Sequence, residues 1–119
     1  MAVDNEYSLR WQRDAHRVLG EFLAAATKVN LPAMSWTIAT SGALVGDVDS
    51  LNSTPAEMRA VFEAWTRWLN VEGVTDRMRR DDVTHLYAQF RRGKGASEVR
   101  GAIRADIFPP MDVDDEAGA

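Results

Sequence analysis

The side chains best suited to acid–base or metal chemistry are the two histidines, His16 and His85. A metal site needs a second strong ligand one helical turn away or directly across a hairpin. His16 has no such neighbour on its helix, so it is expected to be a surface residue. His85 lies near Asp81 and Asp82, but this grouping at the start of a strand is typical of solvated polar residues. The sequence therefore predicts no metal site.

Nucleophilic and cofactor chemistry also lack a motif. The chain contains no cysteine, which excludes disulfides, thiolate ligands and cysteine nucleophiles. The stretch Arg92-Gly93-Lys94-Gly95 resembles half of a phosphate-binding loop but lacks the spaced glycines and the following helix. No Ser, His and acid set has local support. We predict no catalytic residue, no cofactor and no enzyme, and an enzyme built around His85 is only the third hypothesis.

A candidate contact surface lies on the outward positions of a predicted hairpin near the end of the chain. Arginine beside an aromatic residue on an open sheet suits an acidic protein surface, or phosphates and stacked bases of single-stranded nucleic acid. The first hypothesis is a non-enzymatic protein-binding or regulatory accessory module, and the alternative is a nucleic-acid-binding accessory protein. The residues of this surface are His85, Tyr87, Gln89, Arg91, Arg100 and Arg104.

The four tryptophans divide into two pairs. Trp36 and Trp65 fall on apolar faces and are expected in the core. Trp11 and Trp68 fall nearer the edges of their helical stripes, so we expect them to mark an interface.

The elements that must position these residues follow from hydrophobic periodicity. Spacings of three and four indicate helices, and strict alternation indicates strands. Thr54, Pro55 and Glu57 form the signature of a capped helix start. Gly46 is expected to leave room for Trp36 on the neighbouring strand. The predicted elements are helices 7–29 and 55–70 and strands 33–40, 43–49, 84–91 and 99–107.

This order describes an α-β-β unit used twice. It predicts an α+β fold with a four-stranded, mostly antiparallel sheet and two helices on one face. Residues 1–108 are expected to form one domain and residues 109–119 an acidic, flexible tail. The small outward residues of the first hairpin and the open sheet edges suggest a homodimer.

Charge and composition restrict the setting. No signal segment or transmembrane stretch is evident, so a cytoplasmic protein that does not enter membranes is expected. The net charge is −4, but residues 77–104 hold eight basic residues against three acidic ones. Residues 105–119 hold five acidic residues and no base. The tail either solubilises the chain, folds over the arginines or docks elsewhere as a short peptide.

The runs LPAMSWTIATSGALVGDV and PAEMRAVFEAWTRWL resemble small uncharacterised proteins of actinobacteria and their phages or mobile elements. The resemblance covers about half of the chain and rests on structural motifs. It implies actinobacteria, or their phages or mobile elements, as the source, but it identifies no function and assigns no site residue.

Overall fold

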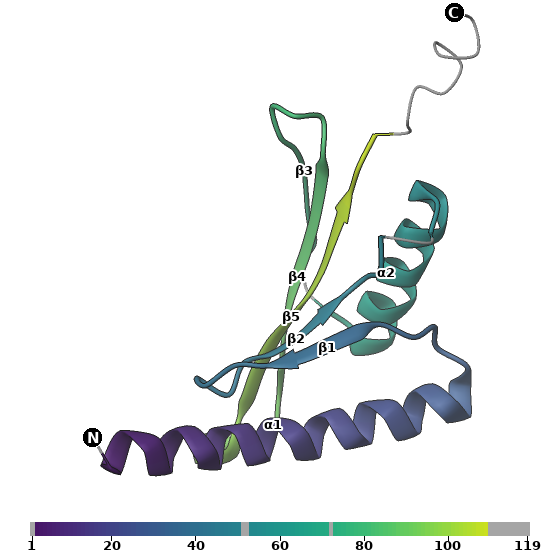
Figure 1. The fold of residues 1–119 in the computed structure, drawn as a ribbon. Helices are drawn as coiled ribbons and strands as arrows, with labels where there is room; N and C mark the ends of the chain where they lie inside the picture. Colours follow the sequence, from purple (N-terminus) through teal and green to yellow (C-terminus); the bar gives the residue numbers. More distant parts are fainter. Residues whose placement is uncertain (1, 51–52, 72, 110–119) are drawn as a thin grey trace, which may run out of the picture.

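The computed structural model describes residues 2–50, 53–71 and 73–109 (Figure 1). Within these residues two helices and five strands form an α+β fold, which is the fold class that the periodicity predicts. The elements in chain order are α1 (Ala2–Val29), β1 (Ser35–Ile38), β2 (Leu44–Asp47), α2 (Pro55–Leu69), β3 (Thr75–Met78), β4 (Thr84–Arg92), a 3-10 turn (Gly95–Ser97) and β5 (Val99–Ile107).

The helix boundaries are set by local chemistry. At the start of α2, the Glu57 N–H donates to Thr54 Oγ1 at 3.1 Å, and the Thr54 N–H donates to Glu57 Oε1 at 2.7 Å. This reciprocal pair is the predicted capping box. α1 and α2 are each followed by an asparagine in left-handed conformation, Asn30 with φ 60° and Asn70 with φ 56°. Asparagine tolerates this geometry, which ends a helix.

The sheet has the strand order β1-β2-β5-β4-β3. Three of its four contacts are antiparallel, while β2 and β5 run parallel. The predicted number of strands, four, was therefore wrong. The sheet is mostly antiparallel, as predicted, with one parallel contact between β2 and β5. The second α-β-β unit also contains an additional strand, β3.

β3 was missed because its sequence carries no strand pattern. Thr75–Met78 reads TDRM, and all four residues are exposed. As an edge strand with no buried face, it cannot show the alternation by which strands are recognised. The segment between the predicted helix 55–70 and the predicted strand 84–91 thus contains a strand, which pairs with the first half of β4.

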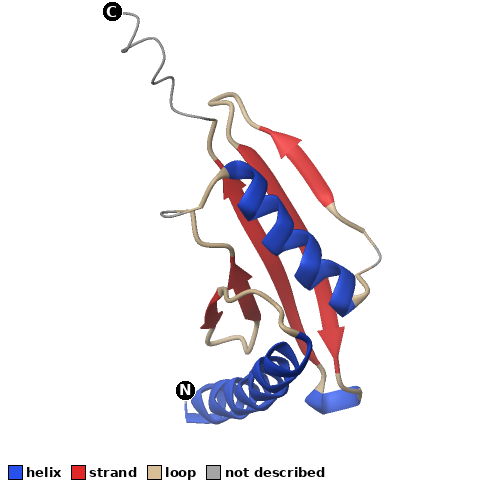
Figure 2. Ribbon diagram, turned by 90° about the vertical axis from the view of Figure 1, so that its right-hand side faces the viewer, coloured by secondary structure: helices blue, strands red, loops and turns tan. Residues whose placement is uncertain are grey.

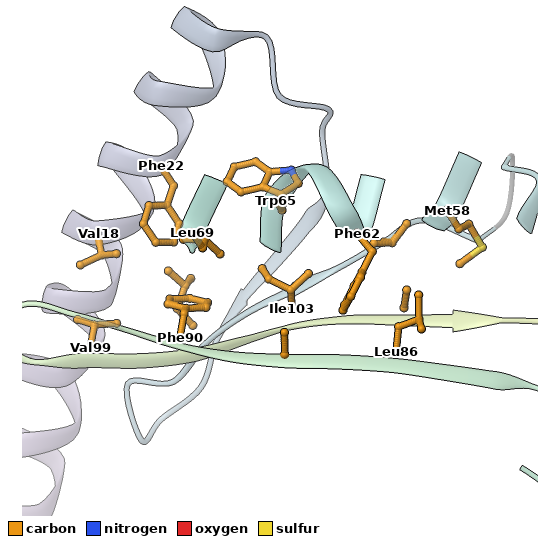
Figure 3. Close-up of a cluster of buried hydrophobic side chains, with 14 of the residues drawn as sticks. Val18, Phe22, Met58, Phe62, Trp65, Leu69, Leu86, Phe90, Val99 and Ile103 are labelled. Carbon is orange, nitrogen blue, oxygen red and sulfur yellow. The ribbon is translucent and has the colours of Figure 1, made fainter. Parts of the chain in front are cut away.

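Both helices pack against one face of the sheet. Figure 2 shows α2 lying across the long strands, with α1 near the end of the sheet that carries the 3-10 turn. Between them Phe22 joins Trp65 and Phe90, with ring centroids 6.3 and 5.4 Å apart, and Ile103 lies beneath (Figure 3). This contiguous cluster is the core.

Gly46 has the predicted role. A Cβ atom at this position would lie 3.0 Å from the ring of Trp36, its partner across the β1–β2 pair. Trp36 is half-buried and meets the Trp65 ring edge-on at 5.3 Å. The glycine thus allows the indole to lie flat over β2.

Two further expectations concern the end of the chain and membranes. β5 ends at Ile107, and residues 110–119, most of the predicted acidic tail, lie outside the described residues. In the described part of the chain, no helix has the length and apolar character that crossing a membrane requires.

Candidate functional site

The face of the sheet opposite the core carries the predicted contact residues. Along β4, Leu86, Ala88 and Phe90 are buried, while the residues between them point the other way and are at least partly exposed. Figure 1 views the sheet nearly edge-on, with α2 on one side of the β4–β5 pair. We call the opposite side the polar face. It comprises Asp47, His85, Tyr87, Gln89, Arg91, Arg100, Arg104 and Asp106.

The β4–β5 register sets which of these side chains are neighbours. His85 lies opposite Asp106, and Tyr87 lies opposite Arg104. Arg91 lies opposite Arg100 at the end near the hairpin turn. The prediction that the arginines share one face with His85 and Tyr87 is consistent with this register.

Arg104 is held by an aspartate from another part of the chain. Its Nε and Nη2 donate to the two carboxylate oxygens of Asp47 on β2, at 3.0 and 3.1 Å. This two-point hydrogen bond raises the pKa of Arg104 above its ordinary value, with burial acting in the opposite direction. The guanidinium group is therefore fixed in position and its charge is balanced.

A second set of contacts fixes the aromatic residues of the polar face. His85 Nδ1 contacts Asp106 Oδ1, and the imidazole stacks on Tyr87 with centroids 6.3 Å apart and an interplanar angle of 18°. Gln89 Nε2 donates to the Tyr87 hydroxyl at 3.1 Å. The side chains form a connected row rather than a set of independent surface groups.

The acid next to His85 is not one of those that the sequence suggested. Asp81 pairs with Arg79 at 3.8 Å and accepts a hydrogen bond from the Val83 N–H at 3.1 Å, while Asp82 forms a turn with φ 64°. Among the described residues, no group of three or more His, Cys, Asp or Glu side chains could hold a metal ion. His85 and Asp106 therefore make a two-residue contact.

The two arginines near the hairpin turn differ in their partners. Arg100 Nε donates to Glu98 Oε1 at 3.2 Å. Within the described residues Arg91 has no acidic partner, although it faces the like charge of Arg100 across the strand pair. Of the three arginines on this face, two are paired with carboxylates, and Arg91 is the one without an acidic partner in the part of the chain that the structure describes.

The predicted interface tryptophans lie in different surroundings. Trp68 is half-buried and its ring meets Phe22 edge-on at 5.5 Å, so it contributes to the core. Trp11 is 42% exposed and stacks on Tyr7 with centroids 6.0 Å apart. A groove of about 270 Å³ extends from Trp11 past Gly42 to Arg100, which places Trp11 close to one end of the polar face.

A larger groove, of about 840 Å³, was not predicted. It is lined by residues 69–71 and 73–75, at the end of α2 and after it, and by the second half of β4, and we call it the edge groove. The sequence carries no signal for it, because β3, whose four residues end beside the nine-residue β4, shows no strand pattern. Its lining includes Leu69, Val71, Gly73, Val74, Tyr87, Gln89, Arg91 and Arg92.

Asp47 and Asp106 were also missing from the predicted surface. Asp106 alternates with Arg104 on β5, so its place opposite His85 followed from the hairpin pattern. Asp47 reaches Arg104 only through the parallel β2–β5 pair, across a separation of 57 residues, and nothing local indicates this contact.

Comparison with known proteins gives no family. No protein-family model, no curated protein and no solved structure matches the chain.

Proposed function

We propose that this chain is a non-enzymatic protein-binding module and that the polar face is its contact surface. The observation that supports this function is the ordering of side chains on the polar face, where Arg104 is held by Asp47, and Tyr87 by His85 and Gln89. A side chain that is already fixed loses little conformational entropy on binding. Tyrosine and arginine are also the residues that dominate the energetics of protein interfaces.

The pairing of the arginines favours a protein partner over a nucleic acid. Affinity for nucleic acids comes chiefly from cations that neutralise phosphates. Arg100 and Arg104 are already balanced by Glu98 and Asp47, so binding phosphate there would require these ion pairs to be broken or shared. A protein surface with both donors and acceptors can instead be matched by the row as it stands.

The test compares the affinity of the wild-type chain and of three full-length variants for one purified partner. Tyr87→Ala and Arg100→Glu alter the polar face, and Arg67→Glu makes the same charge change at an exposed position of α2. A partner recovered from the source cell and purified should bind the wild type and Arg67→Glu equally. Its dissociation constant should rise at least about tenfold for the two face variants. Equal affinity for all four chains would refute the proposal.

A nucleic-acid accessory role is the second candidate, and one observation favours it. Arg91 lies beside Arg100 without an acidic partner among the described residues, and Tyr87 is on the same face. Cations next to an exposed aromatic ring suit single strands. The test of this candidate measures binding of the full chain to a mixed-sequence single-stranded oligonucleotide at low salt. Binding that weakens with salt and is lost when Arg91, Arg100 and Arg104 are replaced would favour this candidate over the first.

A further inference from the structure

The second half of β4 has a free edge. β4 pairs with β5 along Thr84–Arg92, but on its other side it pairs with β3 only over 84–87. Beyond Tyr87, none of the described strands continues the sheet on that side. A free strand edge offers backbone donors and acceptors to another extended chain.

The hydrogen-bond pattern identifies which backbone groups point to this edge. The Arg79 N–H donates to the Val83 carbonyl at 2.9 Å, so Val83 directs its backbone groups toward β3. Because these directions alternate along an antiparallel strand, every second residue after Val83 does the same. Past the end of β3 these residues are Gln89 and Arg91.

One end of the free edge is already closed by Arg92. Its guanidinium group donates to the Arg91 carbonyl at 3.0 Å and to the Leu69 carbonyl at the end of α2 at 3.2 Å. It also lies over the Phe22 ring, 5.8 Å from the centroid. The groups left for an incoming strand are the N–H and C=O of Gln89 and the N–H of Arg91.

The edge groove provides space beside these groups, and its two sides differ chemically. On the side of the segment after α2, its lining includes the apolar residues Leu69, Val71 and Val74, together with Asn70, Thr75 and Arg92. Toward the polar face it is bordered by Arg91 and Arg100. Successive side chains of an extended strand point to opposite faces. A strand lying here would place every second side chain against the apolar border and the others beside the arginines.

We propose that the edge groove takes up an extended segment of a partner protein, with alternating apolar and acidic side chains, as an additional strand beside Gln89 and Arg91 of β4. Backbone ladder bonds supply affinity in this binding mode, and side-chain pockets supply specificity. The acidic positions complement Arg91, which has no acidic partner among the described residues. This inference rests on the proposed protein-binding function and specifies the chemical class of its partner.

The test titrates the full chain with a synthetic peptide of the sequence Val-Asp-Val-Asp-Val, capped at both ends. Amide signals of Gln89 and Arg91 should shift in NMR spectra, and their exchange with solvent should slow. The peptide with backbone N-methyl groups at alternate residues keeps its side chains but loses ladder donors, and should bind at least about tenfold more weakly. The Val-Lys-Val-Lys-Val peptide should not bind.

Two variants of the protein test how much the charge of Arg91 contributes to peptide binding. Arg91→Glu should weaken binding of the acidic peptide at least about tenfold, while Arg67→Glu should leave it unchanged. Equal affinity for the methylated and unmethylated peptides would overturn the proposal. So would changes in the NMR amide signals that are confined to strands other than β4. These comparisons do not depend on a substitution that risks unfolding β4, because the ladder is tested in the peptide.

Other occupants would give different results. A concentration-dependent dimer that is lost in Arg91→Glu would assign the edge to a second copy of the chain. Peptide binding that begins only after Asp112, Asp114, Asp115 and Glu116 are changed to their amides would assign it to the chain's own acidic segment. Either result would overturn the proposal. If the peptide does not bind, but binding of a purified partner still depends on Tyr87 and Arg100, the proposed function stands and only this inference fails.

Discussion

At the residue scale, the most constrained position is Gly101 in the central strand. A Cβ atom there would overlap the carbonyl oxygen of Leu44 on one neighbouring strand and the ring of Phe90 on the other. The bare backbone is what allows Phe90 to lie across β5. Gly20, on α1, differs because a Cβ atom there would meet nothing within 4 Å.

We predict opposite effects of alanine at these two glycines. Gly101→Ala should lower the free energy of unfolding by about 1–3 kcal/mol or more, because the sheet or Phe90 must move. Gly20→Ala should raise it by about 0.5–1 kcal/mol, since alanine favours the helix. Urea denaturation of both variants measures the difference. Similar values for the two would show that the space around Gly101 is not limiting.

The helix cap gives a prediction about pH. The hydrogen bond from the Thr54 backbone N–H, followed by that from its side chain, lowers the pKa of Glu57 from its ordinary value of 4.5. A lowered pKa in the folded state stabilises the fold above pH 4.5, and this stabilisation is lost as pH falls through the lowered pKa. Wild type should therefore be more stable than Glu57→Gln at neutral pH, and the difference should shrink in acid.

Thermal unfolding across a pH series measures this effect. Glu63→Gln is the matched control, because Glu63 is an exposed acid on the same helix and takes no part in the cap. A difference between wild type and Glu57→Gln that stays constant down to strongly acidic pH would contradict the role of the carboxylate.

At the element scale, prediction from sequence succeeded where the deciding interactions are local. The capping box lies within four residues, Thr54 to Glu57, and β4 and β5 are adjacent and alternate strictly. It failed for β3, whose four residues are all exposed, and for the β2–β5 pair, which joins distant segments. In the candidate site, the β4 residues and the two β5 arginines were predicted, whereas Asp106 on β5 was missed although the hairpin pattern places it opposite His85. Asp47 on β2 was missed because only the distant β2–β5 pair brings it to Arg104.

The free edge of β4 gives a prediction that needs no ligand. The N–H groups of Ala88 and Phe90 point toward β5, and those of Gln89 and Arg91 toward the edge. In hydrogen exchange, the second pair should therefore exchange at least about tenfold faster than the first. Equal protection along 88–91 would mean that another part of the chain already pairs with this edge in solution.

At the scale of the whole molecule, one residue connects all the layers. Phe22 of α1 contacts Trp36 from β1, Trp65 and Trp68 from α2, and Phe90 from β4. Because these rings belong to a single cluster, no element has a separate core of its own. The described part of the chain should unfold as one cooperative unit.

Replacing Phe22 tests this cooperativity. Phe22→Ala should cost about 3–5 kcal/mol, as expected for a buried aromatic residue that leaves a cavity. Leu23→Ala, at the next position and 49% exposed, should change stability by no more than about 0.5 kcal/mol. Tryptophan fluorescence and far-UV circular dichroism should give coincident unfolding curves for each protein. Separate transitions would indicate that α1 unfolds independently of the sheet.

The position of β5 in the chain has a consequence for biosynthesis. β5 joins β2 to β4 and connects the two halves of the sheet, yet it comes after the other four described strands in sequence. While the ribosome has released the chain only as far as β4, Leu44 and Phe90 have no Gly101 between them. The nascent chain therefore exposes two apolar half-sheets until β5 emerges, and it is during this interval that a chaperone would bind it.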